Sequence, residues 1–261
     1  MPTPIMHLVL AEEILHSDDL PLAARRLLIR QRGPFLLGNT APDVQTISGQ
    51  PRKETHFCTV PRTTDRPTCE ALFAAHPHLA HAESLPPAQA AFIAGYLAHL
   101  ALDEVWLAAV YERHFLGDWG SRREQLFLHN VLRIWMDARD QQRLNGSVSV
   151  ALCKAMPQDW LPFVGDEHLR TLRDWLVGQL GPGGRVQTAE VFARRMDVPV
   201  AEMEAVLRSP RQMEERIFGR ISRAELESFR DTGYARSIAS INRYLANWQA
   251  GNLSTGQSTN I

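Results

Sequence analysis

The chain has 261 residues, of which 44 % are hydrophobic and 22 % are charged. These values are ordinary for a globular protein with a substantial core, in one large domain or one domain with a smaller appendage. The formal net charge of −1 argues against broad attraction to nucleic acid or to an anionic membrane. No apolar run approaches the roughly 20 residues that cross a bilayer, so we expect no transmembrane segment.

Cysteine usage and the N-terminal residues bear on the compartment. Cys58, Cys69 and Cys153 are odd in number and lack metal-finger spacing, which favours reduced or incidental thiols. The N-terminus lacks the basic start, apolar centre and small-residue cleavage site of a signal peptide. We therefore expect a cytoplasmic protein, although a leader removed earlier would leave no trace. The oligomeric state stays open.

The first third of the chain predicts two helices and then a break. One helix begins near Pro4, a good first-turn residue, and a second covers roughly residues 21–30. Between residues 33 and 67, glycine and proline recur so often that we expect a long irregular segment. Such a segment is unusual inside a helical protein and invites a functional explanation.

The rest of the chain also reads as helix. A long helix opens after Ser84 and ends near Gly117, and a glycine within it, Gly95, permits a neighbouring backbone to approach closely. Another helix runs from Ser121 to about Arg143. We predict an all-α fold, with a metal-site domain over residues 1–180, a helical extension over 185–250 packed on the same core, and a flexible tail over 251–261.

Five residues of metal-ligand type are the most informative feature: His7, Asp43, His56, His99 and Asp103. His99 and Asp103 are four apart, so a helix places both on one face, in an otherwise apolar stretch. Histidine and aspartate bind zinc, and also iron or manganese. Taken singly, each residue has an ordinary explanation, as a hydrogen-bonded core histidine or a turn aspartate.

The order and context of the five residues resemble a known family. Residues 4–8 (PIMHL), 35–43 (FLLGNTAPD), 55–57 (THF) and 95–103 (GYLAHLALD) are similar to successive motifs of zinc-dependent phospholipase C. The S1/P1-type nucleases are distant relatives of that family. The resemblance covers roughly residues 4–115 and implies an all-helical fold of the phospholipase C/P1 nuclease type around one or two zinc ions.

The resemblance also implies roles for the five residues. Asp43, His56 and His99 would bind one zinc, and Asp103 would bridge to a second zinc that His7 also binds. Asp43 would lie nearest the attacking water, as ligand or general base. The reaction would be hydrolysis of a phosphoester by metal-activated water, on a small phosphoester or a phospholipid headgroup.

The chain departs from the family pattern downstream of Asp103. The secreted enzymes bind a further zinc through histidines and a glutamate one turn after the last of them. The candidates here are His114 and His129, but the residue four after His129 is Arg133. Two alternatives therefore stay open: a non-catalytic helical protein that retains the scaffold, and a metalloenzyme of different chemistry, such as iron-dependent oxidation.

Four further features complete the sequence interpretation. Trp106 is either a wall of the pocket or ordinary core, and Glu104 is assigned a structural or supporting role. Arg52 could meet a substrate phosphate, although a solvated loop charge is the default. Residues 188–207 have the rhythm of a helix-turn-helix, but Glu202 and Glu204 would be repelled by DNA phosphates, which favours a simple helical hairpin.

Overall fold

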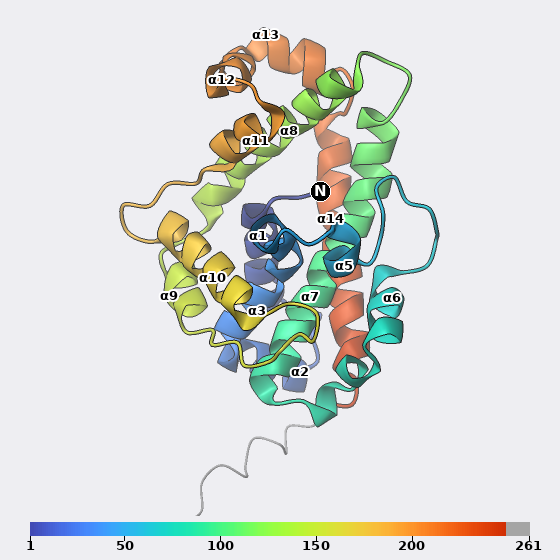
Figure 1. The fold of residues 1–261 in the computed structure, drawn as a ribbon, viewed down its shortest axis with the longest axis vertical. Coiled ribbons are helices and arrows are strands. Elements are labelled where there is room, and N and C mark those ends of the chain that lie inside the picture. Colours follow the sequence, from blue (N-terminus) through green and yellow to red (C-terminus); the bar gives the residue numbers. More distant parts are fainter. Residues whose placement is uncertain (249–261) are drawn as a thin grey trace, which may run out of the picture.

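The computed structural model describes residues 1–248, and these residues contain helices and turns but no strand (Figure 1). The predicted all-α fold is confirmed. The first half contains α1 (Pro4–Leu15), α2 (Leu22–Arg30), α3 (Arg32–Gly38), η1 (Ala41–Val44), α4 (Gln45–Ser48), α5 (Arg52–His56), α6 (Thr68–Ala75), η2 (Pro77–Ala80), η3 (Ala82–Ser84), α7 (Pro87–Trp106) and η4 (Leu107–Phe115). The second half contains α8 (Arg122–Asp140), η5 (Gln141–Arg143), α9 (Ser147–Cys153), α10 (Asp166–Leu180), α11 (Thr188–Met196), α12 (Val200–Arg208), α13 (Pro210–Gln212), η6 (Met213–Phe218) and α14 (Arg223–Tyr244).

The segment 33–67, predicted to be irregular, is mostly a series of short helices, so that prediction is wrong for residues 33–56. The prolines lie where a helix begins: Pro34 and Pro42 are in the first turns of α3 and η1, and Pro51 directly precedes α5. Proline is tolerated there because first-turn amides have no partner within the helix. Gly49, with φ of 75°, ends α4. The glycines and prolines mark helix ends, and residues 57–67 are the longest stretch of this segment without a helix.

Helix α7 is the centre of the fold, and α3 crosses it with backbone in contact. A Cβ on Gly38 would lie 2.0 Å from the carbonyl oxygen of Phe92, and a Cβ on Gly95 would lie 2.2 Å from that of Phe35. Real Cβ atoms essentially never come so close. The close approach predicted at Gly95 is confirmed, and a second glycine on α3 takes part in it.

Helix α14 packs along α7 on another side (Figure 1). The Ser237 hydroxyl donates to the carbonyl of Ala98 at 3.1 Å, and Gly233 lies against Leu102. The described part of the predicted extension, residues 185–248, thus contributes a helix to the central core. The predicted tail over 251–261 lies outside the described residues, as do 249 and 250.

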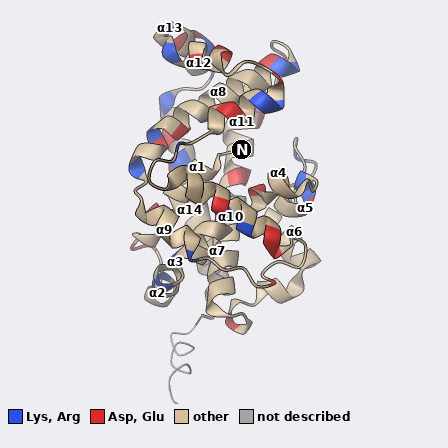
Figure 2. Ribbon diagram, turned by 60° about the vertical axis from the view of Figure 1, so that its left-hand side comes forward, with Lys and Arg blue, Asp and Glu red and all other residues tan. Residues whose placement is uncertain are grey.

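The continuous helix Pro87–Phe115 has 29 residues and is long and apolar enough to span a membrane. In its most apolar window, 78 % of the residues are buried inside the protein, as expected of a core helix. Such a helix is weak support for a membrane span, and the absence of a transmembrane segment stays a prediction. Charges of both signs are spread over the helices (Figure 2).

Candidate metal centre

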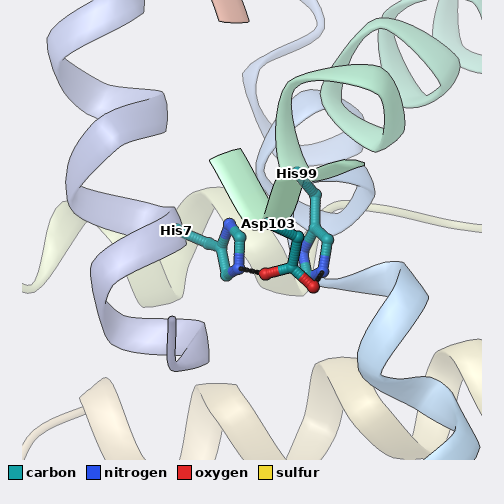
Figure 3. Close-up of side chains that lie close together, drawn as sticks. All are labelled: His7, His99 and Asp103. Carbon is teal, nitrogen blue, oxygen red and sulfur yellow. Dashed lines mark ion pairs between the residues drawn. The ribbon is translucent and has the colours of Figure 1, made fainter. Parts of the chain in front are cut away.

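Helix α1 places His7 in the core. Thr3 is the N-cap, its side chain accepts from the amide of Met6 at 3.4 Å, and Pro4 occupies the first helical position. These are favourable residues for a helix start. One turn later His7 is completely buried, with its ring directed toward α7 (Figure 3).

Helix α7 supplies His99 and Asp103, one turn apart as the sequence predicted (Figure 3). The Nδ1 atom of His99 lies 2.8 Å from the carbonyl oxygen of Asn39. A carbonyl can only accept, so Nδ1 carries the proton and Nε2 presents its lone pair. Because Asn39 directly follows α3, the glycine crossing of α3 and α7 sets this contact.

The remaining two residues come from the short helices. Asp43 lies in η1, directly after Pro42, and His56 is the last residue of α5. The Thr55 hydroxyl lies 3.0 Å from Nδ1 of His56. The Tyr96 hydroxyl of α7 donates to the backbone carbonyl of Thr55, which ties α5 to the central helix beside His56.

The structure brings all five predicted residues together. His7, His99 and Asp103 form one group, and Asp43, His56 and His99 form another; the ligand atoms within each group all lie within 4.8 Å of one another. The Nε2 atoms of His56 and His99 are 3.4 Å apart.

Asp103 lies between the two groups. Its Oδ1 is 3.5 Å from Nε2 of His7, and its Oδ2 is 3.5 Å from Nε2 of His56 and 3.7 Å from Nε2 of His99. On the other side of His56, its Nε2 lies 3.5 Å from Oδ1 of Asp43. A carboxylate with one oxygen toward each group can bridge two cations.

Burial sets the charge of the imidazoles. It lowers the pKa of His7 to about 4, and the neighbouring His99 adds to this effect. Burial, followed by the positive charge of Arg52, also lowers the pKa of His56 to about 4. Both imidazoles are therefore neutral at neutral pH, the form that binds a metal.

Both carboxylates are ionised. Burial alone would raise the pKa of Asp103, but the charges of His99 and Arg52 outweigh it and hold that pKa well below its usual range. For Asp43 burial likewise opposes ionisation, but the hydrogen bond to His56 and the electrostatic effect of His99 and His56 together outweigh it and lower the pKa. Arg52 forms an ion pair with Asp103, with its Nη2 2.5 Å from Oδ2. The default of a solvated loop charge is therefore wrong for Arg52.

The donor set fits a divalent cation. Among the described residues, neither ring nitrogen of His7 has a hydrogen-bond partner, and neither does Oδ1 of Asp103, although all three atoms are buried. The rings of His7 and His99 stack with centroids 3.7 Å apart, so both present an edge to the same side. Three imidazoles and two carboxylates suit zinc, iron or manganese.

A cavity of about 260 Å³ adjoins the cluster. Asp43 is the one member of the five that lines it, together with Arg52 from α5, Arg133 from α8 and Arg195 from α11. Trp175 of α10 forms part of an apolar wall. The cavity therefore combines an acidic residue of the cluster, three guanidinium groups and an aromatic surface.

The structure does not bring the other candidate residues to this cluster. Nε2 of His129 accepts a hydrogen bond from Nε1 of Trp106 at 3.0 Å, so that nitrogen is not free. Trp106 is completely buried and does not line the cavity. Nε2 of His114 lies 3.5 Å from Glu225. Glu104 accepts from the amide and hydroxyl of Thr68 at 2.5 and 2.7 Å and so fixes the start of α6.

Sequence interpretation missed Arg133 as a cavity residue and missed Asp137 altogether. Asp137 accepts hydrogen bonds from the hydroxyls of Thr3 and Thr188, two residues of the cavity wall. The sequence contains a pattern that could have indicated these residues. His129, Arg133 and Asp137 follow one another at intervals of four on α8, and this spacing forms a polar stripe along one helix face. The residues 188–207 form α11 and α12, and α11 covers the cavity.

Comparisons with known protein families, with curated proteins and with solved structures each gave no match to this chain. The functional argument therefore depends on the geometry of the site itself.

Proposed function

We propose that this protein is a metal-dependent hydrolase that cleaves a phosphoester, with an activity like that of zinc-dependent phospholipase C, which its motifs resemble. The observation that carries the proposal is the meeting of His7, Asp43, His56, His99 and Asp103 in one cluster, which adjoins an arginine-lined cavity through Asp43. A metal centre alone fits several chemistries, whereas adjacent guanidinium groups favour a substrate that carries phosphate.

The residues present would bind one or two ions, with zinc as the first candidate. Asp43, His56 and His99 would form one site, and His7 with Asp103 the other, with Asp103 between them. A bound divalent ion supplies Lewis-acid activation of water and neutralises charge on phosphate oxygens.

The side chains of the chain itself have distinct roles in this proposal. Asp43, ionised and exposed to the cavity, orients the attacking water and accepts its proton. Arg52 is fixed by Asp103 with its guanidinium at the cavity wall, where it stabilises negative charge on the phosphate. Asn39 fixes the tautomer of His99, so that the lone pair on Nε2 always faces the cluster.

The test is metal content followed by hydrolysis. Protein purified without chelator or added metal is analysed by mass spectrometry, beside His99→Ala and Asp103→Ala. His129→Ala serves as the control, since it removes an equally buried histidine outside the cluster. We expect one or two zinc ions per chain in the wild type and the control, and a loss in the two site variants.

Hydrolysis is then measured on p-nitrophenyl phosphate, bis(p-nitrophenyl) phosphate and a short-chain phospholipid. We expect metal-dependent release of product from at least one of them, lost in Asp43→Asn. Bound metal without hydrolysis of any phosphoester would contradict the proposal. Iron in place of zinc would favour oxidative chemistry on the same ligands.

One observation favours the non-catalytic alternative. The short contact between Arg52 and Asp103 satisfies one carboxylate oxygen without a metal, as in a structural ion pair. The two functions differ in Arg52→Gln. Both predict unchanged metal content in this variant. A structural pair predicts lower stability in a protein without hydrolytic activity, whereas the hydrolase proposal predicts that kcat/KM falls.

A further inference from the structure

Two of the cavity arginines lack the carboxylate partner that Arg52 has. Arg133 and Arg195 line the same cavity, and neither has a carboxylate oxygen within 4.0 Å in the described part of the chain. Arg195 is exposed at the cavity mouth, and Arg133 is half-buried deeper inside. Two like charges facing one small space repel each other unless an anion lies between them.

Neutral contacts hold the Arg133 side chain in place. Its Nη1 donates to the carbonyl of Met1 at 3.0 Å, its Nη2 donates to Oδ1 of Asn130, and its guanidinium lies 4.0 Å from the ring of Phe192. Its Nε is buried and has no partner. Burial lowers the pKa of Arg133 to about 10; the nearby charges of Asp137 and Asp43 oppose this effect, and the charge of Arg195 adds to it. The guanidinium is charged at neutral pH and is fixed in orientation, and no carboxylate of the described residues lies within the 4.0 Å of an ion pair.

The rest of the cavity restricts what can bind. A volume of about 260 Å³ suits a compact molecule and not a polymer segment. Trp175, with 37 % of its surface exposed, offers an aromatic face to an apolar or planar group. In the metal-free protein Asp43 repels anions on its own side of the cavity, so an oxyanion is favoured on the side of the arginines.

We infer that Arg133 and Arg195 form an oxyanion subsite, and that the substrate is a compact phosphoester carrying a second anionic group, a phosphate or a carboxylate. The second group binds the two arginines while the reacting phosphate lies at the His/Asp cluster. This assignment of substrate class rests on the proposed function, but the subsite itself does not require metal.

The test uses the metal-free protein and inorganic phosphate, titrated by calorimetry after the chelator has been dialysed away. Arg195→Gln is the principal variant, because its side chain is exposed and its loss leaves the core unchanged. Arg194→Gln is the matched control. It removes the same charge from the preceding residue, which is also exposed but does not line the cavity.

We expect phosphate to bind the wild type and Arg194→Gln with affinities within about twofold of each other. Arg195→Gln should bind about 10-fold or more weakly, as is typical when a charge-assisted hydrogen bond is lost. Added sodium chloride should weaken the binding. Equal affinity of the two variants, or no binding to the wild type, would overturn the subsite.

Two further measurements separate the subsite from the metal centre. His99→Ala should still bind phosphate, because the subsite does not require metal. If the wild type binds phosphate but hydrolyses no phosphoester, the hydrolase proposal is refuted and the subsite is retained. In the active enzyme, Arg195→Gln should lower kcat/KM about 10-fold more for a bisphosphate than for a monoester. An equal fall for both substrates would refute the assignment of substrate class.

Discussion

The glycine crossing of α3 and α7 allows a quantitative prediction. In Gly95→Ala the new Cβ would lie 2.2 Å from the carbonyl oxygen of Phe35 and 2.9 Å from the amide nitrogen of Asn39. An ordinary contact is at least 3.4 Å, so the two helices must separate by about 1.2 Å, the difference between 3.4 and 2.2 Å. Both neighbours are backbone atoms and cannot rotate away.

Overpacking of this kind costs about 1–3 kcal/mol. For a chain of this size, 1 kcal/mol shifts Tm by about 2–4 °C, so Gly95→Ala should lower Tm by about 2–12 °C. Gly178→Ala is the matched control, since Gly178 also lies within a helix but has no atom within 4 Å of the added Cβ. Alanine there should stabilise the protein by about 0.5–1 kcal/mol, because glycine is a poor helix former.

Thermal unfolding is followed by circular dichroism in the metal-free protein, so that stability does not depend on bound ions. Metal uptake is then measured separately. Because Asn39 fixes the ring of His99, Gly95→Ala should also weaken metal binding, whereas Gly178→Ala should not. A Tm for Gly95→Ala equal to or above that of the wild type would refute the backbone contact between the helices.

Three other outcomes follow from the structure. Added zinc at 100 times its Kd should stabilise the protein by about 2.7 kcal/mol, visible as a rise in Tm that is absent in His99→Ala. Burial raises the pKa of Asp137 to about 7; its neutral form is therefore favoured on folding, and the stability present below about pH 3.8 is lost as the pH rises through 7. Asp137→Asn should remove this dependence of stability on pH, so its Tm should exceed that of the wild type at pH 8 and equal it at pH 3.5. Equal Tm values at pH 8 would show that ionisation of the Asp137 carboxyl does not destabilise the fold. His129→Phe should lower Tm, because the indole of Trp106 loses its acceptor, but mass spectrometry should find its metal content unchanged.

The parts of the fold that depend on local sequence could be predicted. The long helix around His99 and Asp103 is predicted by an apolar run between the prolines before it and Gly117, although residues 90–103 are buried on every face and not on one stripe. The start of α1 at Pro4 and the close approach at Gly95 follow from the special backbone properties of proline and glycine. These features put three of the five ligand residues, His7, His99 and Asp103, on correctly predicted helices before any tertiary contact is known.

The remaining features depend on contacts between distant segments. Glycine and proline are frequent between residues 33 and 67, and this pattern is the same for a loop and for a series of short helices. Only packing on α7 and α10 decides between the two structures. Arg133 and Arg195 lie on helices that look ordinary in sequence. Their importance comes from the arrival of both at a cavity that also contains Asp43, about 90 residues or more away along the chain.

The candidate centre differs from other buried polar groups in that its unpaired atoms face one another. Nδ1 of His129, the Tyr244 hydroxyl and Nε1 of Trp248 are also buried without a partner, but Nε2 of His129 accepts from Trp106, and both oxygens of Asp137 accept from threonines. His7 is as deeply buried and has no hydrogen bond on either nitrogen. Burying such a group without a partner costs about 1–3 kcal/mol, and an apolar residue would avoid that cost. The unpaired edge of His7 faces an unpaired oxygen of Asp103, which is the arrangement expected of side chains placed to bind a cation.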